Sequence, residues 1–487
     1  MAAFARIKGA RLADICILYA REDRNQAKSL HDTLANAYSV WWDDDLRVGD
    51  WRSEVETQIS QARCVIPLWS SASRQSATVI DEVSFAKSRK IHLLPVKLEK
   101  VGAPLEFGSL HTVDLSGWDG DPGDDRYQEL HRNLSSVLGN RTVAQSRLCE
   151  WKIGGKSGEL PLFFFSISSF ETALTPEAAA QAVALCSPKA ALHSAYDVIK
   201  AKNGARSAAL AYLERFRSNG GVVALDSGNY EATRKRDRRW KADTFHEALS
   251  LASYDFAFCF DDVLTDGDAP EIAEAVCKAV ERDLRFTSQP VIPIVHAPVD
   301  RPTGRVNSVL LPRIMQDVCR QLHPQLIAVP ERELGDGLFT RAKAVHQIRQ
   351  SLDDLGFYQP LHLLGTGNPL SIAVFASVGA DSFDGLEWCR TAIDANTGRL
   401  HHLQQYDLFS WQTEYATSPI VRESVAQKSL AYPAKVVFHN LDGFSTWMTE
   451  LREHARARKI DRFLAAKLPD ATANLRALEN AVPEVFN

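Results

Sequence analysis

The sequence predicts an α/β protein in which an open, doubly wound parallel sheet is followed by a (β/α)8 TIM barrel. Two observations lead to this prediction. Short apolar runs alternate with helical patterns along the chain, which is typical of parallel sheets whose strands are joined by helices. The length of 487 residues exceeds what one hydrophobic core usually supports, so we expect two domains.

The first sheet is predicted from apolar runs that resemble buried strands. These runs lie at residues 15–19, 40–42, 64–69 and 91–98. Leu30 and Leu34 recur at helical spacing after the first run, and Val55, Ile59 and Ala62 do so after the second. Because ligands of such sheets bind at the carboxyl ends of the strands, polar residues that follow the runs are candidate site residues.

Three segments that overlap or follow these apolar runs carry characteristic combinations of polar and aromatic residues. They are ILYAREDR at 17–24, VWWDDDLRVGDW at 40–51 and SATVIDE at 76–82. In this order they resemble the boxes of Toll/interleukin receptor (TIR) domains, over roughly the first 140 residues. The resemblance implies a flavodoxin-like sheet. It also implies, as in enzymatic TIR domains, a glutamate that cleaves the nicotinamide N-glycosidic bond of NAD.

By its position in these boxes the catalytic glutamate would be Glu82, six residues after Ser76. A carboxylate suits this chemistry because it stabilises the positive charge that develops on the ribose as the bond breaks. Arg21, Trp51 and Ser76 would bind the NAD substrate, although the family often carries tryptophan where Thr78 stands. Each residue also has a simpler interpretation: Glu82 could be an exposed acid on a helix, Arg21 a surface arginine and Trp51 a core tryptophan.

The second region contains eight short apolar runs at even spacing, which predict the barrel. They lie at residues 163–167, 191–192, 222–225, 256–260, 291–295, 326–329, 362–364 and 380–383. Polar residues follow most of them, namely Ser194, Asp226, Asp261, His296, Glu331 and Asp384. Strand ends of such a barrel meet at one mouth, where its active sites lie. We place the first domain at 1–145, a glycine-rich linker at 146–160 and the barrel with a helical extension at 161–487.

A second set of segments belongs to the barrel. They are HLLGTGNPLSIAVFASVGADSFD at 362–384, ALDSGNYE at 224–231, FCFDD at 258–262, IAVPE at 327–331 and FHNLDGFSTWMTELREH at 438–454. They are similar to segments of tRNA-guanine transglycosylases and of the relatives that insert 7-deazaguanine bases into DNA. The resemblance implies base exchange on ribose through a covalent glycosyl–enzyme intermediate.

The same resemblance implies a role for each strand-end residue. Asp384 would be the nucleophile that attacks the ribose C1′, and Asp226 the acid/base partner of the base. Ser227, Asp261 and His296 would bind the base, with His296 standing where the family usually has glutamine. A single aspartate after a strand is more often a helix cap or turn residue, but three on different strands favour a shared site.

The stretch TRKRDRRWK at 233–241 follows directly and carries six basic residues and a tryptophan. We expect Arg234, Lys235, Arg238 and Arg239 to bind phosphates of tRNA or DNA, and the tryptophan to stack a base. The alternative is a solvated charged face.

No metal is expected. The zinc site of the transglycosylases uses three closely spaced cysteines and a histidine, and no cysteine follows Cys389. His439 stands at the position of the histidine ligand, and we expect it to be a buried, hydrogen-bonded side chain of the C-terminal helix.

Composition limits the function classes. The net charge of −5 excludes nucleic-acid binding by the charge of the whole chain, so a local patch is needed. The eight cysteines form no CxxC pair, and no apolar run approaches the ~20 residues of a membrane helix. We therefore expect a cytoplasmic protein without a membrane segment.

The leading functional hypothesis is a bacterial anti-phage defence protein. Its TIR domain would hydrolyse NAD under the control of a barrel that senses or modifies nucleic acid or a nucleotide, and it would act as a homo-oligomer. The defence role rests on analogy with fused bacterial TIR proteins. Two alternatives stay open: a base-exchange enzyme on tRNA or DNA with the TIR domain as an assembly module, and a non-catalytic interaction protein.

Overall fold

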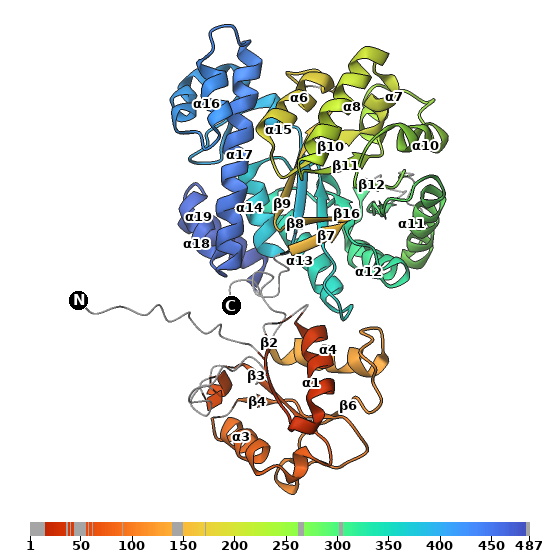
Figure 1. Ribbon diagram of the computed structural model, residues 1–487, viewed down its shortest axis with the longest axis vertical. Coiled ribbons are helices and arrows are strands. Elements are labelled where there is room, and N and C mark those ends of the chain that lie inside the picture. The colour runs from red at the N-terminus through yellow and green to blue at the C-terminus, as the bar shows by residue number, and fades with distance from the viewer. Residues whose placement is uncertain are drawn as a thin grey trace, which may run out of the picture. The chain divides into compact units, whose positions relative to one another are not determined.

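The computed structural model describes residues 15–35, 38, 40–42, 55–56, 58–60, 62–89, 91–138, 150–170, 172–261, 267–300 and 305–483. The chain forms two compact units, Met1–Arg147 with Asp353–Tyr358 and Leu148–Leu352 with Gln359–Asn487. Each unit is built on parallel strands with helices packed around them (Figure 1). No helix in the described part of the chain is long and apolar enough to cross a membrane.

The first unit is an open parallel sheet with strand order β2-β1-β3-β5-β6, and β4 also pairs with β3. Its strands are β1 Ile15–Leu18, β2 Val40–Trp41, β3 Cys64–Trp69, β4 His92–Leu93, β5 Val96–Lys97 and β6 Val113–Asp114. Its helices are η1 Arg21–Asp23, α1 Arg24–Leu34, η3 Ser73–Gln75, α3 Ala77–Ser88, η4 Leu105–Phe107 and α4 Asp125–Leu138. This is the flavodoxin-like order: β2 is added on one side of β1 and the later strands on the other side, so the switch point lies between β1 and β3. It confirms the predicted fold class of the first unit.

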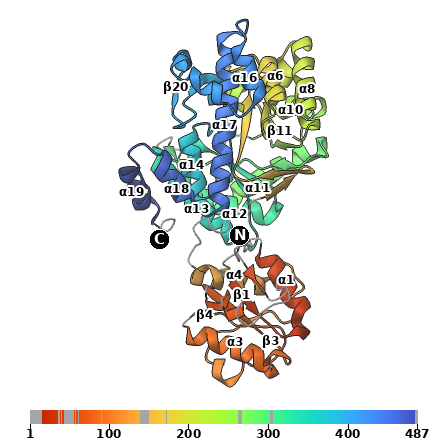
Figure 2. The ribbon, with the colours of Figure 1, turned by 60° about the vertical axis from the view of Figure 1, so that its left-hand side comes forward.

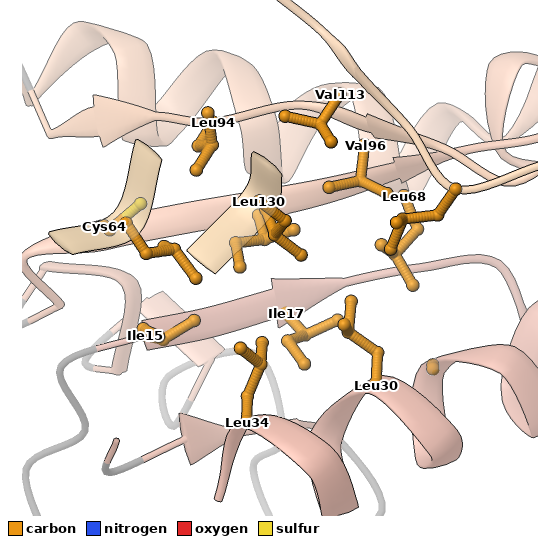
Figure 3. Packing of buried hydrophobic residues seen from close by; sticks show 14 of the residues in the cluster. Ile15, Ile17, Leu30, Leu34, Cys64, Leu68, Leu94, Val96, Val113 and Leu130 are labelled. Carbon is orange, nitrogen blue, oxygen red and sulfur yellow. The ribbon is translucent and has the colours of Figure 1, made fainter. Parts of the chain in front are cut away.

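Alternation along β1 explains why helices cover both faces of this sheet. Ile15 and Ile17 pack with α1 and α4, together with Leu30 of α1 (Figure 3). Cys16 and Leu18 point to the opposite face, into a cluster that contains α3. Successive strand residues face opposite sides, so a strand apolar throughout must be buried on both.

The second unit is a closed barrel of eight parallel strands. They are β9 Leu162–Ile167, β10 Ala190–Ser194, β11 Val222–Asp226, β12 Phe256–Phe258, β13 Val291–Ile292, β16 Ile327–Pro330, β17 Leu361–Leu364 and β18 Ser382–Gly385. β18 pairs with β9, and a bridge between Ile294 and Ala328 joins β13 to β16, so the ring closes. All eight predicted strands are present, and the TIM barrel is confirmed.

Helices surround this barrel and extend beyond it. They are α6 Pro176–Cys186, α7 Ala195–Lys200, α8 Asn203–Ser218, α9 Asn229–Arg234, α10 Ala242–Leu251, α11 Ala269–Asp283, α12 Leu311–Leu322, α13 Leu338–Asp353, α14 Pro369–Val378 and α15 Glu387–Arg390. The C-terminal extension contains α16 Pro419–Ala426, α17 Tyr432–Arg456, α18 Ile460–Lys467 and α19 Ala471–Ala481. The longest of these, α17, lies along the outside of the barrel and contacts α6, α14 and α18 (Figure 2).

The stretch expected to be a linker is not one throughout. Residues 146–160 include two antiparallel strands, β7 Glu150–Ile153 and β8 Lys156–Glu159. These strands form a hairpin that belongs to the second unit. Trp151 packs edge-on against Phe164 and Phe256 inside the barrel, and its indole N–H donates to the Gln325 carbonyl at 2.9 Å. The hairpin therefore contributes to the barrel core.

Candidate functional sites

In the first unit, two of the proposed NAD-site residues share one helix. Ser76 is the N-cap of α3, and its hydroxyl accepts a hydrogen bond from the Val79 amide. Glu82 lies in the second turn of the same helix and is partly buried. Arg21 is exposed and begins η1 at the carboxyl end of β1, and β1 and β3 are neighbours in the sheet. Trp51 lies outside the described residues.

The same edge of the sheet holds a buried aspartate that the sequence analysis did not single out. Asp23 is 7% exposed and accepts a hydrogen bond of 2.6 Å from the Ser70 hydroxyl, which follows β3. Burial raises the pKa of Asp23 and exceeds the lowering by Ser70, and the charges of Glu99 and Glu22 add to it. This pair ties the segments that follow β1 and β3 together.

The barrel mouth encloses a cavity of about 340 Å³. Six of the residues expected at the site line it, namely Asp226, Ser227, Arg234, Asp261, His296 and Asp384. Asp226 and Asp384 lie within the last two residues of β11 and β18, and the other four follow β11, β12 or β13; the carboxyl ends of these strands meet at this mouth. The structure thus brings together groups that are up to 158 positions apart in the chain (226 to 384).

Asp384 is the third residue of β18, and three groups contact its carboxyl oxygens. Its Oδ1 accepts from the Gly365 amide at 2.8 Å and from the His362 imidazole at 3.3 Å. Its Oδ2 accepts from the Ser166 hydroxyl at 2.8 Å, and the residue is 8% exposed. Asp384 also lines the cavity, and a carboxyl group held in place by such contacts is positioned to act as a nucleophile.

Asp261 belongs to a charged chain with His296 and Glu333. Its Oδ2 lies 2.7 Å from His296 Nε2, and His296 Nδ1 lies 2.9 Å from Glu333. Burial lowers the pKa of His296, but the hydrogen bonds to both carboxylates outweigh it and raise that pKa to about 9. Oδ1 of Asp261 accepts from Ser227 and from Asn229, both at 2.7 Å. Asn229 therefore anchors Asp261.

Asp226 faces a different environment. Burial raises its pKa well above the usual value, and the charges of Glu231, Asp261 and Asp384 add to the shift. Glu231 also lines the cavity, and its two oxygens accept from the Ser168 hydroxyl at 2.5 Å and the Ser194 hydroxyl at 2.9 Å. Its environment therefore favours the neutral form of Asp226 more than water does, and an acid of this kind beside the Asp384 carboxyl group suits acid–nucleophile chemistry.

The sequence analysis missed Glu231 and Glu387 as cavity residues. The signal for Glu231 was its place five residues after Asp226, at the start of a helix in the same turn. The signal for Glu387 was its place three residues after Asp384. Neither spacing by itself distinguishes a cavity residue from an ordinary acid in the first turn of a helix.

The basic stretch is largely exposed, but its tryptophan is not. Of the four basic residues expected to bind phosphate, Arg234 lines the cavity, and Lys235, Arg238 and Arg239 are exposed. Trp240 is 6% exposed, and its indole N–H donates to the Ser227 carbonyl at 3.1 Å. The expectation that this tryptophan stacks a base is therefore wrong, since its ring packs beneath the turn that carries Ser227.

His439 is buried in α17, as expected. Its Nε2 lies 2.9 Å from the Ile393 carbonyl, and its Nδ1 lies 3.3 Å from the Thr413 hydroxyl. Among the residues with described positions, no group of three or more His, Cys, Asp or Glu side chains is arranged to hold a metal ion.

The strand order defines the first unit as a doubly wound α/β domain whose switch point lies between β1 and β3. Residues 15–131 match the model of the TIR domain family, so this part of the chain is a TIR domain. TIR domains serve in signalling, and some members cleave NAD. No curated protein matches the chain. The likeness of the barrel to transglycosylases stays a prediction.

Proposed function

We propose that the TIR domain hydrolyses NAD at its nicotinamide N-glycosidic bond, with Glu82 as the carboxylate that acts on the ribose. The observation that carries this proposal is the family match at 15–131, which includes Glu82 on α3. As the bond to nicotinamide breaks, positive charge develops at C1′ and a partly buried carboxylate stabilises it. Water then adds at C1′, giving nicotinamide and ADP-ribose.

The purified full chain tests this proposal. Nicotinamide released from NAD is measured by chromatography at several protein concentrations, with and without added tRNA or DNA. We expect the rate of release per protein molecule to rise with protein concentration, because the proposed active form is a homo-oligomer. Release that nucleic acid increases supports control by the barrel and the proposed role in bacterial anti-phage defence. No release under any of these conditions contradicts the proposal.

A second activity is favoured by the cavity at the barrel mouth, where Asp226 and Asp384 both lie. In this proposal Asp384 attacks C1′ of a nucleotide in tRNA or DNA, the C1′–N bond breaks, and the base departs with the proton of Asp226. An entering base gives a proton back to Asp226 and displaces Asp384 from C1′. Intact mass after incubation with nucleic acid and excess base reports the covalent intermediate and exchange.

A further inference from the structure

The barrel mouth holds a second cavity beside the one that Asp226 and Asp384 line. It has a volume of about 300 Å³ and is lined by His296, Ala297, Val299, Val306, Arg332 and Glu333. His296 and Arg332 line the first cavity as well. Sites for small organic ligands typically measure about 300–1,000 Å³, so the second cavity is large enough to take a chemical group of its own. A ligand of the first cavity can therefore continue past Arg332 into the second.

The exposed wall of the second cavity is apolar. It comes from a hairpin that follows β13, in which β14 Val299–Asp300 pairs antiparallel with β15 Arg305–Val306. Val299 and Val306 lie opposite each other in this pair, so they share one face, and they are 43% and 47% exposed. His296 and Glu333 add little surface, because they are 5% and 8% exposed and contact each other. Two adjacent, half-exposed valines favour contact with an apolar group of a ligand.

Arg332 supplies a positive charge between the two cavities. It lies in η7 Glu331–Glu333, which follows β16, and its side chain is 59% exposed. Among the described residues its one ion-pair partner is Glu333, at 3.9 Å, which is too long for a hydrogen bond. The neighbouring Glu331 pairs instead with Arg341, at 2.7 Å. The guanidinium group of Arg332 therefore keeps donors for a ligand, and its planar fork suits a phosphate.

The two cavities differ in charge. Asp226, Glu231 and Asp384 line the first, whereas the acid of the second, Glu333, is hydrogen bonded to His296. An anionic group would be repelled by the three acids of the first cavity, so the negative charge of a ligand that fills both cavities belongs at Arg332. Such a ligand has an uncharged part in the first cavity, an anionic link at Arg332 and an apolar part on the valines.

We propose that the barrel binds two adjoining nucleotides of a single strand, with one in the first cavity, the base of the other on Val299 and Val306, and the phosphate that joins them at Arg332. A nucleobase has an apolar face for the valines and a ring on which a guanidinium group can stack. Because the second cavity offers few hydrogen bonds, this position should accept any base. The inference rests on the proposed base-exchange activity, which places a nucleotide in the first cavity, and adds that the substrate is a strand and not a free nucleoside.

Fluorescence anisotropy of a labelled single-stranded oligonucleotide of mixed sequence, titrated with the full chain, tests the apolar wall. Val306→Asn is expected to weaken binding about fivefold or more and to leave the salt dependence unchanged, because it removes apolar surface and no charge. The control is Val309→Asn, the same change in η6 Ser308–Leu310 at a valine that is 79% exposed and lies outside the cavity lining.

Arg332→Gln tests the phosphate contact in the same titration. It is expected to weaken binding about tenfold at moderate salt and to flatten the salt slope by about 0.7, the value for one phosphate of a single strand. Arg285→Gln, an exposed change in η5 Leu284–Phe286, is the control. A nucleoside monophosphate used as competitor should lose affinity in Arg332→Gln but not in Val306→Asn, because it lacks the second base.

A milder variant guards against misfolding of the hairpin. Val299→Thr combined with Val306→Thr keeps the shape and strand preference of both residues, and it should weaken binding less than Val306→Asn but more than Val309→Asn. If Val306→Asn binds the oligonucleotide like Val309→Asn, or if Arg332→Gln keeps the salt slope of Arg285→Gln, the proposal is overturned. NAD binding that depends on both positions, without oligonucleotide binding, also overturns it and assigns the two cavities to a free dinucleotide.

Base exchange is scored separately from binding. Exchange that survives unchanged in both Val306→Asn and Arg332→Gln contradicts the two-nucleotide contact and not the activity. Binding that depends on both positions, in a chain that exchanges no base, contradicts the activity and supports the contact.

Discussion

The two candidate sites hold their acids in different ways. In the TIR domain Glu82 projects from the flank of α3 and is partly buried. In the barrel Asp384 lies next to the end of its strand, is 8% exposed and has three hydrogen-bond partners in its own unit. An acid at the end of a barrel strand is surrounded by the neighbouring strands, whereas an acid on the flank of a surface helix keeps part of its surface exposed. The comparison predicts that the barrel site is complete in one chain and that the TIR site depends on assembly.

The largest effect is expected from Glu82→Gln, which tests the TIR side of the comparison. Glutamine keeps the volume but cannot offset the developing positive charge, so nicotinamide release should fall by about 10²–10³-fold or more. Asp81→Asn, an exposed change at the adjacent position of α3, should leave turnover unchanged. Turnover like that of the wild type in Glu82→Gln would remove Glu82 from the catalytic role.

Asp384→Asn tests the barrel in the same way. The amide is not a nucleophile, so base exchange should fall by about 10³-fold or more and no covalent adduct should form. Binding of tRNA or DNA should be nearly unchanged, because asparagine has nearly the volume of aspartate and the basic stretch is intact. Asp243→Asn, an exposed change on α10, is the control. An adduct of unchanged yield would show that another group attacks C1′.

A stability test follows from the base of the barrel. Arg349 and Asp381 are both fully buried, with 3.2 Å between guanidinium and carboxylate, and the carboxylate also accepts from the Leu361 amide at 2.9 Å. Arg349→Met leaves a buried carboxylate without its cation, so the barrel should lose about 3–5 kcal/mol of unfolding free energy. Urea unfolding measures this loss, and a loss below about 1 kcal/mol would mean that water or another group compensates.

A smaller stability effect depends on pH. The folded-state pKa of His296 is about 9, above the roughly 6.5 of an unfolded histidine. The stabilisation is therefore fully present below pH ~6.5 and is lost as the pH rises through the folded value. We expect the barrel to lose on the order of 2–3 kcal/mol between pH 6 and pH 10, and His296→Gln to lack this slope. Equal slopes in both proteins would assign the effect to other groups.

The smallest effect concerns the basic surface. Neutralising Arg234, Lys235, Arg238 and Arg239 together should weaken tRNA or DNA binding by about tenfold at moderate salt. The salt slope should flatten by about 0.7–0.9 for each phosphate that the variant no longer binds. The control neutralises four exposed basic residues on the outer helices, namely Lys278, Arg285, Arg313 and Lys343. Identical salt slopes for the two variants would make the stretch a solvated face.

The sequence predicted the architecture better than the side-chain interactions. Apolar runs and their spacing were sufficient for all eight barrel strands, and acids after the strands were sufficient to find Asp226, Asp261 and Asp384. Spacing did not show that both oxygens of Asp261 are occupied, because the donors come from other strands and turns. Nor did it show that Trp240 is buried, because a tryptophan within a basic run is compatible with either a buried or an exposed ring.

The hairpin of β7 and β8 has a consequence for how the chain can be divided. Its Gly154 has a φ of +52°, and a Cβ there would lie 1.8 Å from the Asp255 carbonyl, so the turn is pressed against the barrel. A fragment that starts at residue 161 would lack Trp151 and leave Phe164 and Phe256 facing an unfilled hollow. Deletion of a large aromatic core residue typically costs about 3–5 kcal/mol. We therefore expect the shortest barrel fragment that folds on its own to include the whole β7–β8 hairpin. A fragment that starts after this hairpin should aggregate on expression.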